Sequence, residues 1–224
     1  MIVARRKDLL EQLKEDLKTD VKIEVLDIST KENCIRLFET NKDIDILINN
    51  AGFGDFGAFD KTDLSKELSM IDTNIKATHI LSKLYLQEMK QKNKGHILNV
   101  ASIAGFMAGP LMATYYATKN YVVSLSKAMN KELQKASSNV HVSVLCPGPV
   151  NTNFDNVANV RFSLKGLSSE YVAQYSINQM LKNKKVIIPG NIMKLIYLGN
   201  KLAPSWLSLE IAYHSQNQKG TKNS

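Results

Sequence analysis

The sequence predicts an α/β fold, with a doubly wound parallel sheet in a single domain. Short apolar segments typical of strands alternate with amphipathic segments typical of helices along most of the chain. Strands that alternate with helices favour a parallel sheet with helices on both faces. The length of 224 residues, 44% of them hydrophobic, suits one domain with a substantial core.

Each expected element follows from its own pattern of apolar residues. The strand segments are short apolar runs, and they cover residues 1–4, 21–26, 44–48, 96–100, 140–145 and 185–188. The helical segments have apolar residues three or four positions apart, and they cover residues 7–19, 30–41, 63–92, 114–136 and 168–183. Residues 186–213 are mostly apolar but contain two prolines, and we treat 186–224 as an apolar, basic C-terminal segment of the same domain as 1–185.

Polar and turn-forming residues follow the expected strands. Asp27 follows the second strand, the run Asn-Asn-Ala-Gly at 49–52 follows the third, and Ser102 follows the fourth. Pro147 and Gly148 follow the fifth. Because ligands of parallel sheets bind beyond the carboxyl ends of the strands, these residues predict a binding site at one edge of the sheet.

Tyr115 and Lys119 form the most informative pair in the sequence. They are four residues apart in an expected helix, so their side chains share one face. A lysine ammonium beside a phenol stabilises the phenolate and lowers its pKa, which would suit proton transfer. The hydroxyl of Ser102 could then hold a carbonyl oxygen near the phenol. Tyr116 also shares a face with Lys119 and is the alternative to Tyr115.

Two further features have both a functional and a structural interpretation. Arg5 and Arg6 follow the first strand, where guanidinium groups could bind a phosphate, but they could equally be an exposed pair. Asn74 is a polar residue in an amphipathic helix. Its alternatives are a functional role and simple exposure or a local hydrogen bond.

Charge and cysteine content exclude several classes of function. The net charge is +8, but aromatic residues are not interleaved with the basic ones, so we expect no nucleic-acid partner. The two cysteines and four histidines have no metal-ligand spacing, and we predict no metal site. Because the start of the chain lacks the pattern of a signal peptide and two free thiols suit a reducing compartment, we predict a cytoplasmic protein.

The chain resembles the short-chain dehydrogenase/reductase family over essentially its whole length. The resemblance rests on an ordered set of residues: Asp27, the run at 49–52, Asn74, Ser102, Tyr115, Lys119, and the Pro-Gly loop with Thr152. It implies a Rossmann-like fold in which 1–185 form the cofactor and catalytic part. It also implies an oxidoreductase that interconverts a carbonyl and an alcohol with NADP (NADPH).

The resemblance also implies roles for individual residues. The catalytic group would be Tyr115 as general acid and base, Lys119, Ser102 and Asn74, with Lys119 also bonding the nicotinamide ribose. The remaining cofactor contacts would come from Arg5 at the 2′-phosphate, Asp27 at the adenine, Asn49 near the adenosine ribose, and Pro147, Val150 and Thr152 in the nicotinamide loop. The family's first strand and its TGxxxGxG turn would precede Met1 and are absent from this sequence. We therefore expect an N-terminally truncated sheet whose strands part or pair wrongly.

The C-terminal segment and the absent turn leave alternatives open. The apolar run at 186–213 would shape a pocket for a hydrophobic small-molecule substrate or form a homo-oligomer contact. With Lys194 and Lys201 it could instead lie on a membrane surface. Two competing hypotheses remain beside the enzyme: a non-catalytic remnant that acts as a binding partner, and a basic membrane-associated binding protein.

Overall fold

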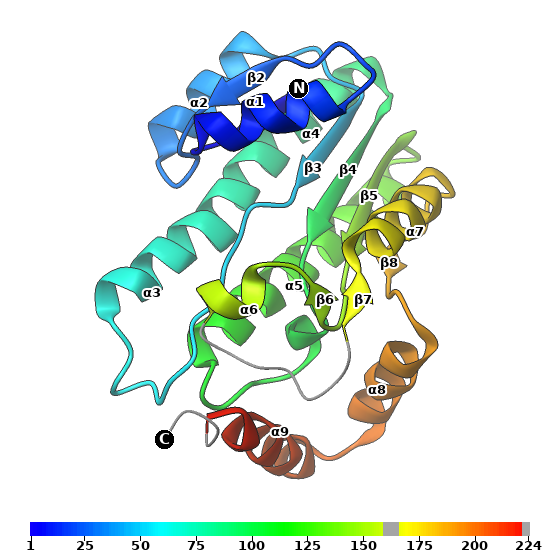
Figure 1. The fold of residues 1–224 in the computed structure, drawn as a ribbon. Coiled ribbons are helices and arrows are strands. Elements are labelled where there is room, and N and C mark those ends of the chain that lie inside the picture. Colours follow the sequence, from blue (N-terminus) through cyan, green and yellow to red (C-terminus); the bar gives the residue numbers. More distant parts are fainter. Residues whose placement is uncertain (159–165, 221–224) are drawn as a thin grey trace.

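The computed structural model describes residues 1–158 and 166–220, and within these the side chains of residues 155, 156 and 218–220 are left out. The strands are short and alternate with helices over most of this length (Figure 1). The strands are β1 (Ile2–Ala4), β2 (Ile23–Val25), β3 (Ile46–Asn49), β4 (Gly95–Val100), β5 (Val140–Leu145), β6 (Val150–Asn151), β7 (Leu167–Ser168) and β8 (Val186–Ile187).

The α-helices differ widely in length. They are α1 (Lys7–Asp16), α2 (Lys31–Thr40), α3 (Leu64–Ile71), α4 (Thr78–Lys92), α5 (Ala113–Lys135), α6 (Phe154–Val157), α7 (Ser169–Leu181), α8 (Asn191–Leu202) and α9 (Ser205–Gly220). A π-helical segment, η1 (Asp72–Ala77), joins α3 to α4, and a 3₁₀ turn, η2 (Ile103–Phe106), precedes α5. Several helices begin where a side chain caps the first turn, as Asp63 does by accepting a hydrogen bond from the amide of Lys66 at 2.7 Å.

All strand pairs in the described residues are parallel, but the strands form three separate sheets. One sheet has the order β3-β4-β5-β8, a second pairs β1 with β2, and a third pairs β6 with β7. The predicted parallel α/β fold is therefore confirmed. The expectation that the strands part is also confirmed, because β1 and β3 belong to different sheets.

Helices cover both faces of the four-stranded sheet. On one face Ile97 of β4 packs with Met89 of α4 and Met129 of α5. On the other face the next residue, Leu98, packs with Met180 of α7. Neighbouring residues of a strand point to opposite faces, so these two clusters define a sheet between two helical layers.

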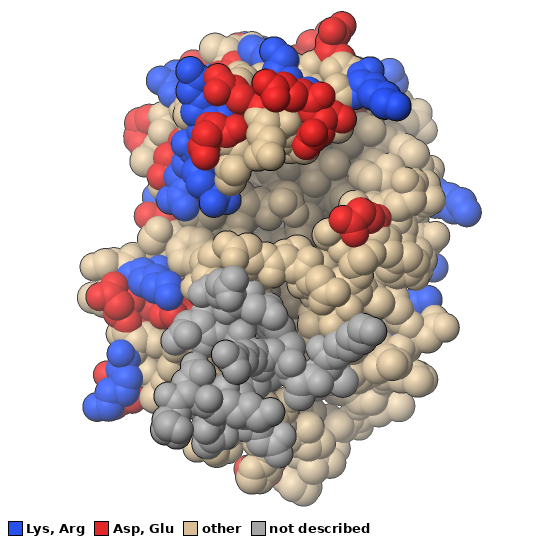
Figure 2. Space-filling model, viewed as in Figure 1, with Lys and Arg blue, Asp and Glu red and all other residues tan. Residues whose placement is uncertain are grey.

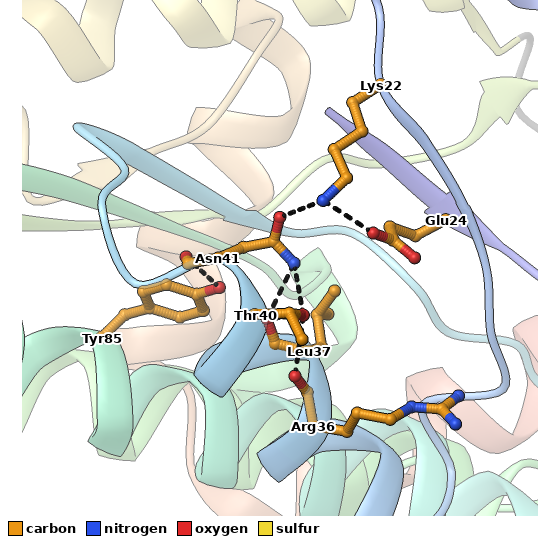
Figure 3. A network of polar contacts seen from close by, with 7 residues as sticks. All are labelled: Lys22, Glu24, Arg36, Leu37, Thr40, Asn41 and Tyr85. Carbon is orange, nitrogen blue, oxygen red and sulfur yellow. Dashed lines mark hydrogen bonds and ion pairs between the residues drawn. The ribbon is translucent and has the colours of Figure 1, made fainter.

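A helix interface links the two-stranded sheet to the rest of the molecule. Leu37 of α2 packs against Tyr85 of α4 in one buried cluster. Figure 3 shows polar contacts at the same place: the hydroxyl of Tyr85 donates to the carbonyl of Asn41 at 3.0 Å, and Lys22 Nζ donates to Asn41 Oδ1 at 2.8 Å. Lys22 also pairs with Glu24 of β2 at 2.9 Å. Side chains in this region therefore connect the β1-β2 sheet to α4, which packs on the four-stranded sheet.

Three regions differ from the elements that the sequence predicts. The short elements β6, α6 and β7 were not predicted. The single helix expected over 63–92 is interrupted by the wider turns of η1. The apolar run at 186–213 forms most of α8 and α9, for which no helix was predicted. The division at residue 185 stays a prediction.

Candidate active site

Tyr115 and Lys119 lie on one face of α5, and both side chains are buried. Lys119 Nζ lies 5.8 Å from the centre of the Tyr115 ring and donates a hydrogen bond to the carbonyl of Val100 at 3.1 Å. Val100 is the last residue of β4, so this bond anchors the lysine at the carboxyl end of a central strand. The spacing of four residues brings the two side chains together, as the sequence predicts.

Ser102 approaches Tyr115 from the loop that follows β4. It caps η2, where its Oγ accepts a hydrogen bond from the amide of Ala104 at 3.2 Å. The same hydroxyl lies 3.4 Å from the carbonyl of Pro147, in the loop after β5. The Ser102 hydroxyl also lies near the Tyr115 hydroxyl, where it lowers the pKa of the phenol. A serine and a tyrosine hydroxyl therefore lie side by side.

Asn74 sits in the π-helical segment and is almost fully buried. Its side-chain amide accepts from the amide of Phe53 at 3.1 Å and donates to the Phe53 carbonyl at 2.9 Å and to Thr118 Oγ1 at 3.0 Å. Thr118 in turn donates to the carbonyl of Tyr115 at 2.7 Å. Asn74 thus connects the loop after β3 to the helix that carries Tyr115. The alternative of a solvent-exposed Asn74 is wrong.

The loop after β3 passes close to these side chains because Gly52 has no side chain. A Cβ atom on Gly52 would lie 2.9 Å from Asn74 Oδ1 and 3.2 Å from Lys119 Nζ. Such a Cβ would force the asparagine to move, so the close approach requires glycine. This observation joins the Asn-Asn-Ala-Gly run to the buried pair on α5.

Burial has the largest effect on the pKa values of the Tyr115 phenol and the Lys119 ammonium. Burial raises the pKa of Tyr115, while the nearby Ser102 hydroxyl acts in the opposite direction. Burial also lowers the pKa of Lys119 to about 8. The pKa of Tyr115 therefore shifts upward, against the expected lowering by Lys119. The reason is that desolvation of the buried phenolate is the largest effect on this pKa.

Aromatic and aliphatic side chains cover Tyr115. The ring of Phe154, on α6, lies 5.4 Å from the Tyr115 ring. Met70, Ala104, Met112 and Ala158 are the other buried members of this cluster. Sequence reasoning missed Phe154 and Thr118. Thr118 could have been found from its place three residues after Tyr115 on the same helix, whereas no local pattern indicates Phe154.

Asn49 is nearly buried, at the end of β3. Its Nδ2 donates to Asn99 Oδ1 at 2.8 Å and lies 3.0 Å from Ser82 Oγ. Asn99 also donates to Ser126 Oγ at 3.0 Å. This network therefore joins β3, β4, α4 and α5. The sequence analysis did not name Ser82, Asn99 or Ser126.

Arg5 and Asp27 lie at the ends of β1 and β2, in the two-stranded sheet. Their side chains form a long ion pair of 3.8 Å, and both are largely exposed, at 71% and 45%. Hydrogen bonding to the amide of Ser29 lowers the pKa of Asp27. The structure thus brings these two residues together beside the β1-β2 sheet, whereas Tyr115 and Lys119 lie on α5.

The loop after β5 carries the remaining predicted residues. The carbonyl of Pro147 accepts a hydrogen bond from the amide of Ile103 at 2.9 Å, which holds this loop against η2. Val150 begins β6 and is partly buried, and the exposed Thr152 accepts from the amide of Phe154 at 3.2 Å. The loop therefore extends from Ser102 to the helix that covers Tyr115.

Two pockets lie beside this site. The larger, of about 330 Å³, is mainly apolar and lies between the loop at 107–110, the start of α5 with Tyr116, and Leu209 of α9. Tyr115 lines the smaller pocket, together with Phe59, Met70 and Met112. None of the described helices is long and apolar enough to cross a membrane.

Comparisons with known proteins place this chain in a family. A family model described as short chain dehydrogenase matches residues 1–161. Among curated proteins, a 3-oxoacyl-(acyl-carrier-protein) reductase of Rickettsia prowazekii is 31% identical over 160 residues, or 71% of this chain and 65% of that protein. The chain covers less than two thirds of the lengths of the three foremost curated relatives: 64%, 63% and 65%.

Solved structures share the fold. A short-chain dehydrogenase from Sphingobium yanoikuyae in complex with NADPH has a TM-score of 0.77 and 24% identity, over 89% of this chain and 82% of that one. A short-chain dehydrogenase/reductase from Burkholderia phymatum in complex with NAD has a TM-score of 0.78 and 22% identity, over 88% of this chain and 82% of that one. Because the family model matches most of this chain, the chain belongs to the short-chain dehydrogenase family.

Proposed function

We propose that this chain interconverts a carbonyl and an alcohol with NADPH as the hydride source. The observation that carries the proposal is the convergence of the Tyr115 and Ser102 hydroxyls beside the buried ammonium of Lys119. A hydroxyl pair of this kind can hold one carbonyl oxygen and deliver one proton to it.

The residues fit the nicotinamide end of such a cofactor. Lys119 is a buried cation, and in the described part of the chain it forms no salt bridge, although it lies near the Tyr115 ring and donates a hydrogen bond to Val100. Ribose hydroxyls are acceptors that such an ammonium can bind. Val150 and Thr152 would lie at the nicotinamide amide, in the loop that begins with Pro147. When bound, the reduced nicotinamide supplies the hydride.

The protein's own part in the reaction is proton transfer and orientation. Because burial raises the pKa of Tyr115, the phenol is neutral at pH 7 and can act as an acid toward a carbonyl oxygen. Ser102 would orient that oxygen. Lys119 would stabilise the phenolate left after the proton has moved. Asn74 would hold a water molecule for reprotonation, at the turn where its amide is fixed by Phe53.

Arg5 supports NADPH over NADH. Its guanidinium is 71% exposed, and its only described partner is Asp27 at 3.8 Å, so a phosphate could compete for it. Asp27 would lie near the adenine, and Asn49 would support the adenosine ribose from its buried network. Arg5→Ala should weaken NADPH binding by about tenfold, the size of one charge-assisted contact, and leave NADH unchanged. Arg6→Ala is the control. Equal weakening of both cofactors would contradict the assignment.

A thermal melt separates the enzyme from a non-catalytic partner. If the folded chain binds NADPH, saturating cofactor should raise the midpoint of a cooperative transition. Lys119→Met should abolish this shift and keep the cooperative transition, since a methionine fills a similar volume. A midpoint that does not respond to NADPH would favour the alternative of a non-catalytic remnant.

We infer a hydrophobic substrate from the apolar surroundings of Tyr115. The Rickettsia relative is named for a 3-oxoacyl group, which agrees with a carbonyl on an apolar chain. The larger pocket lies behind Tyr116 and extends the apolar surface toward α9. Medium-chain 3-oxoacyl thioesters are the first substrates to test, and reduction of short polar ketones alone would contradict this inference.

The outer surface of α8 and α9 supports a second proposal, contact with another copy or with a membrane surface. Ile192, Leu195, Leu202 and Trp206 are each at least 64% exposed. Lysines occur on α8 beside them, which would suit an anionic lipid surface. Salt-sensitive co-sedimentation with anionic vesicles would support the membrane, whereas sedimentation as a dimer without vesicles would support the homo-oligomer. The cytoplasmic location stays a prediction.

A further inference from the structure

The helix α8 carries a stripe of exposed apolar side chains on its outer side. Ile192, Leu195, Leu198 and Leu202 are 64%, 69%, 52% and 77% exposed, and we call these four residues the outer stripe. Their spacing of three or four positions places them along one side of the helix. Trp206, at the start of α9, is 70% exposed as well. Large apolar side chains that are exposed together mark an interaction surface.

The opposite side of α8 is fixed to the loops of the candidate active site. Asn200 Nδ2 donates to the carbonyl of Phe106 in η2 at 2.8 Å, and the ring centre of Tyr197 lies 4.5 Å from that of Phe106. Met193 is buried, and Gly148, in the loop after β5, lies so close to it that a Cβ atom would overlap the methionine sulfur. The outer stripe therefore belongs to a helix that is packed in the fold on its other side.

Lysines border the outer stripe. Lys194 and Lys201 are seven positions apart, so they lie along one line of α8. Each immediately precedes a leucine of the stripe, about 100° around the helix from it. The sequence of α8 contains no Asp or Glu. Residues 171–224 contain seven lysines and one acidic residue, Glu210, so this part of the chain combines an apolar surface with positive charge.

The charged residues of the molecule gather elsewhere on the face shown in Figure 2. Lys, Arg, Asp and Glu are dense on its upper part, where Figure 1 places α1 and α2. The lower right part, where Figure 1 places α8, is nearly free of them in this view. A large uncharged area with lysines at its border is the pattern of a helix that lies in the interface of a membrane.

We propose that the outer stripe and Trp206 dock on the surface of an anionic membrane, with α8 parallel to the bilayer plane. The stripe would enter the boundary between headgroups and acyl chains, and Trp206 would lie at the headgroup level. The stems of Lys194 and Lys201 would extend along the stripe, and their ammonium groups would meet lipid phosphates. This names one partner for the surface that the proposed function leaves to a copy or a membrane. Vesicle binding requires no turnover, so it is tested separately from the proposed reaction.

A second copy of this chain suits the same surface less well. In a two-fold contact a surface meets itself, so α8 would face α8. Neither helix offers an acidic residue to the lysines of the other, and two rows of like charge would enter the contact. Glu210, on α9, already lies 3.2 Å from His214. An anionic lipid supplies a phosphate for each ammonium group.

Docking through α8 would orient the whole molecule. The helix contacts η2, which follows the carboxyl end of β4. Figure 1 shows α8 and α9 at the end of the molecule toward which β4 and β5 run. The edge of the sheet that carries the candidate active site would therefore face the bilayer.

Trp206 makes the docking directly measurable, because it is the only tryptophan in the sequence. Its fluorescence is recorded with the 224-residue chain and vesicles of phosphatidylglycerol or phosphatidylcholine, without any nucleotide. With phosphatidylglycerol we expect a blue shift of the emission and quenching by lipids brominated on their acyl chains. Both effects should be much weaker with phosphatidylcholine, and both should be reduced in roughly 1 M salt, where the screening length falls to about 3 Å. Sedimentation velocity without vesicles records the oligomeric state.

Four variants locate the contact. Leu195→Gln should weaken binding to phosphatidylglycerol vesicles by about tenfold or more, because the burial of one leucine side chain is lost. Leu64→Gln, on α3 and at an equally exposed position, should leave binding unchanged. Lys201→Gln should weaken binding by about fivefold. Lys61→Gln, at an exposed lysine before α3, is the matched control and should have little effect.

Three results would overturn the proposal. The first is Trp206 emission that does not respond to phosphatidylglycerol vesicles. The second is equal weakening of binding by Leu195→Gln and Leu64→Gln, which would mean that the outer stripe is not the contact. The third is a dimer without vesicles that Leu195→Gln dissociates, which would assign the outer stripe to a second copy.

Discussion

At the scale of single residues, burial prepares Tyr115 and Lys119 for opposite tasks. Burial raises the pKa of the phenol, so Tyr115 keeps its proton at neutral pH. Burial lowers the pKa of Lys119 to about 8, so the ammonium is close to losing its proton. The sequence indicated that the two groups share a helix face. It could not show that desolvation would have the largest effect on both pKa values, because desolvation depends on Phe154 and other residues far along the chain.

The pKa of Lys119 predicts how the reduction depends on pH. The ammonium is present below about pH 8 and lost above it. If it stabilises the phenolate of Tyr115, kcat/KM for reduction should be level below that pH and fall by up to tenfold per unit above it. A pH profile of kcat/KM between about pH 6 and 10 measures this. A profile that stays level through this range would exclude the ammonium from the reaction.

Burial of Lys119 should also reduce stability. The shift from 10.5 to about 8 corresponds to about 3 kcal/mol of preference for the neutral amine. Lys119→Met should therefore leave the free energy of unfolding at pH 7 unchanged or raise it by about 1–3 kcal/mol, while turnover is lost. Urea denaturation measures the first effect. A loss of several kcal/mol would instead show that the ammonium is a net stabilising group.

At the scale of elements, the contact of η2 with α5 sets the position of Ser102. Gly105 of η2 lies so close to α5 that a Cβ atom would be 2.7 Å from the carbonyl oxygen of Lys119. Backbone atoms cannot move aside as a flexible side chain can. Gly105→Ala should therefore push η2 away from α5, destabilise the fold by about 1–3 kcal/mol and lower kcat, since Ser102 begins this turn.

Gly199 offers a matched control for this prediction. It lies in α8, and a Cβ atom there would have no neighbour within 4 Å. Gly199→Ala should keep kcat and stabilise the chain by about 0.5–1 kcal/mol through helix propensity. Thermal melts and steady-state rates of Gly105→Ala and Gly199→Ala measure the effects on stability and on kcat. Equal effects of the two substitutions would show that the η2 contact does not position Ser102.

The pairing of β4 with β5 introduces a pH-sensitive contact. His96 and His141 lie opposite each other, with ring centres 5.2 Å apart, and His96 Nδ1 is buried without a hydrogen-bond partner. Burial and then His141 lower the pKa of His96. The unfolded chain therefore binds this proton at a higher pH than the folded one, so stability should fall as pH decreases below about 6.5.

His96→Gln should make the melting temperature less sensitive to pH between about 7 and 5 than it is in the natural chain. The exposed His214, paired with Glu210 on α9, provides the control, and His214→Gln should leave the dependence nearly unchanged. Differential scanning calorimetry at both pH values measures the difference. The same pH dependence in His96→Gln and the natural chain would contradict this account.

At the scale of the whole molecule, most of the fold follows from sequence periodicity. The strands β1 to β5 and β8, and the helices over 7–16, 31–40, 113–135 and 169–181, occur where apolar spacing predicts them. The π-helical turn at Asn74 could not be predicted, because it depends on hydrogen bonds to Phe53 and Thr118 that bridge distant parts of the chain. Likewise, the contacts that join the two sheets through Asn41 and Tyr85 are tertiary.

The candidate site was predictable in part for a related reason. The pair on α5 is local in sequence, and the carboxyl ends of parallel strands place Ser102 and Pro147 near it. Arg5 and Asp27 differ, because they follow two strands that form a sheet of their own, separate from the four-stranded sheet. The relation of the Arg5 group to the Tyr115 group is therefore set by packing of α2 on α4, which no motif encodes.

The central claim is that Tyr115 transfers the proton, and turnover of three proteins tests it most directly. NADPH oxidation with a 3-oxoacyl thioester should be measured for the natural chain, Tyr115→Phe and Tyr116→Phe, with NADPH affinity determined in parallel. We expect Tyr115→Phe to lose at least about a thousandfold in kcat and to keep its cofactor affinity, within the range for a lost general acid. Tyr116→Phe, which loses only the bond with Gln216, should lose little. Retention of kcat by Tyr115→Phe, or the reverse ranking of the two variants, would contradict the account.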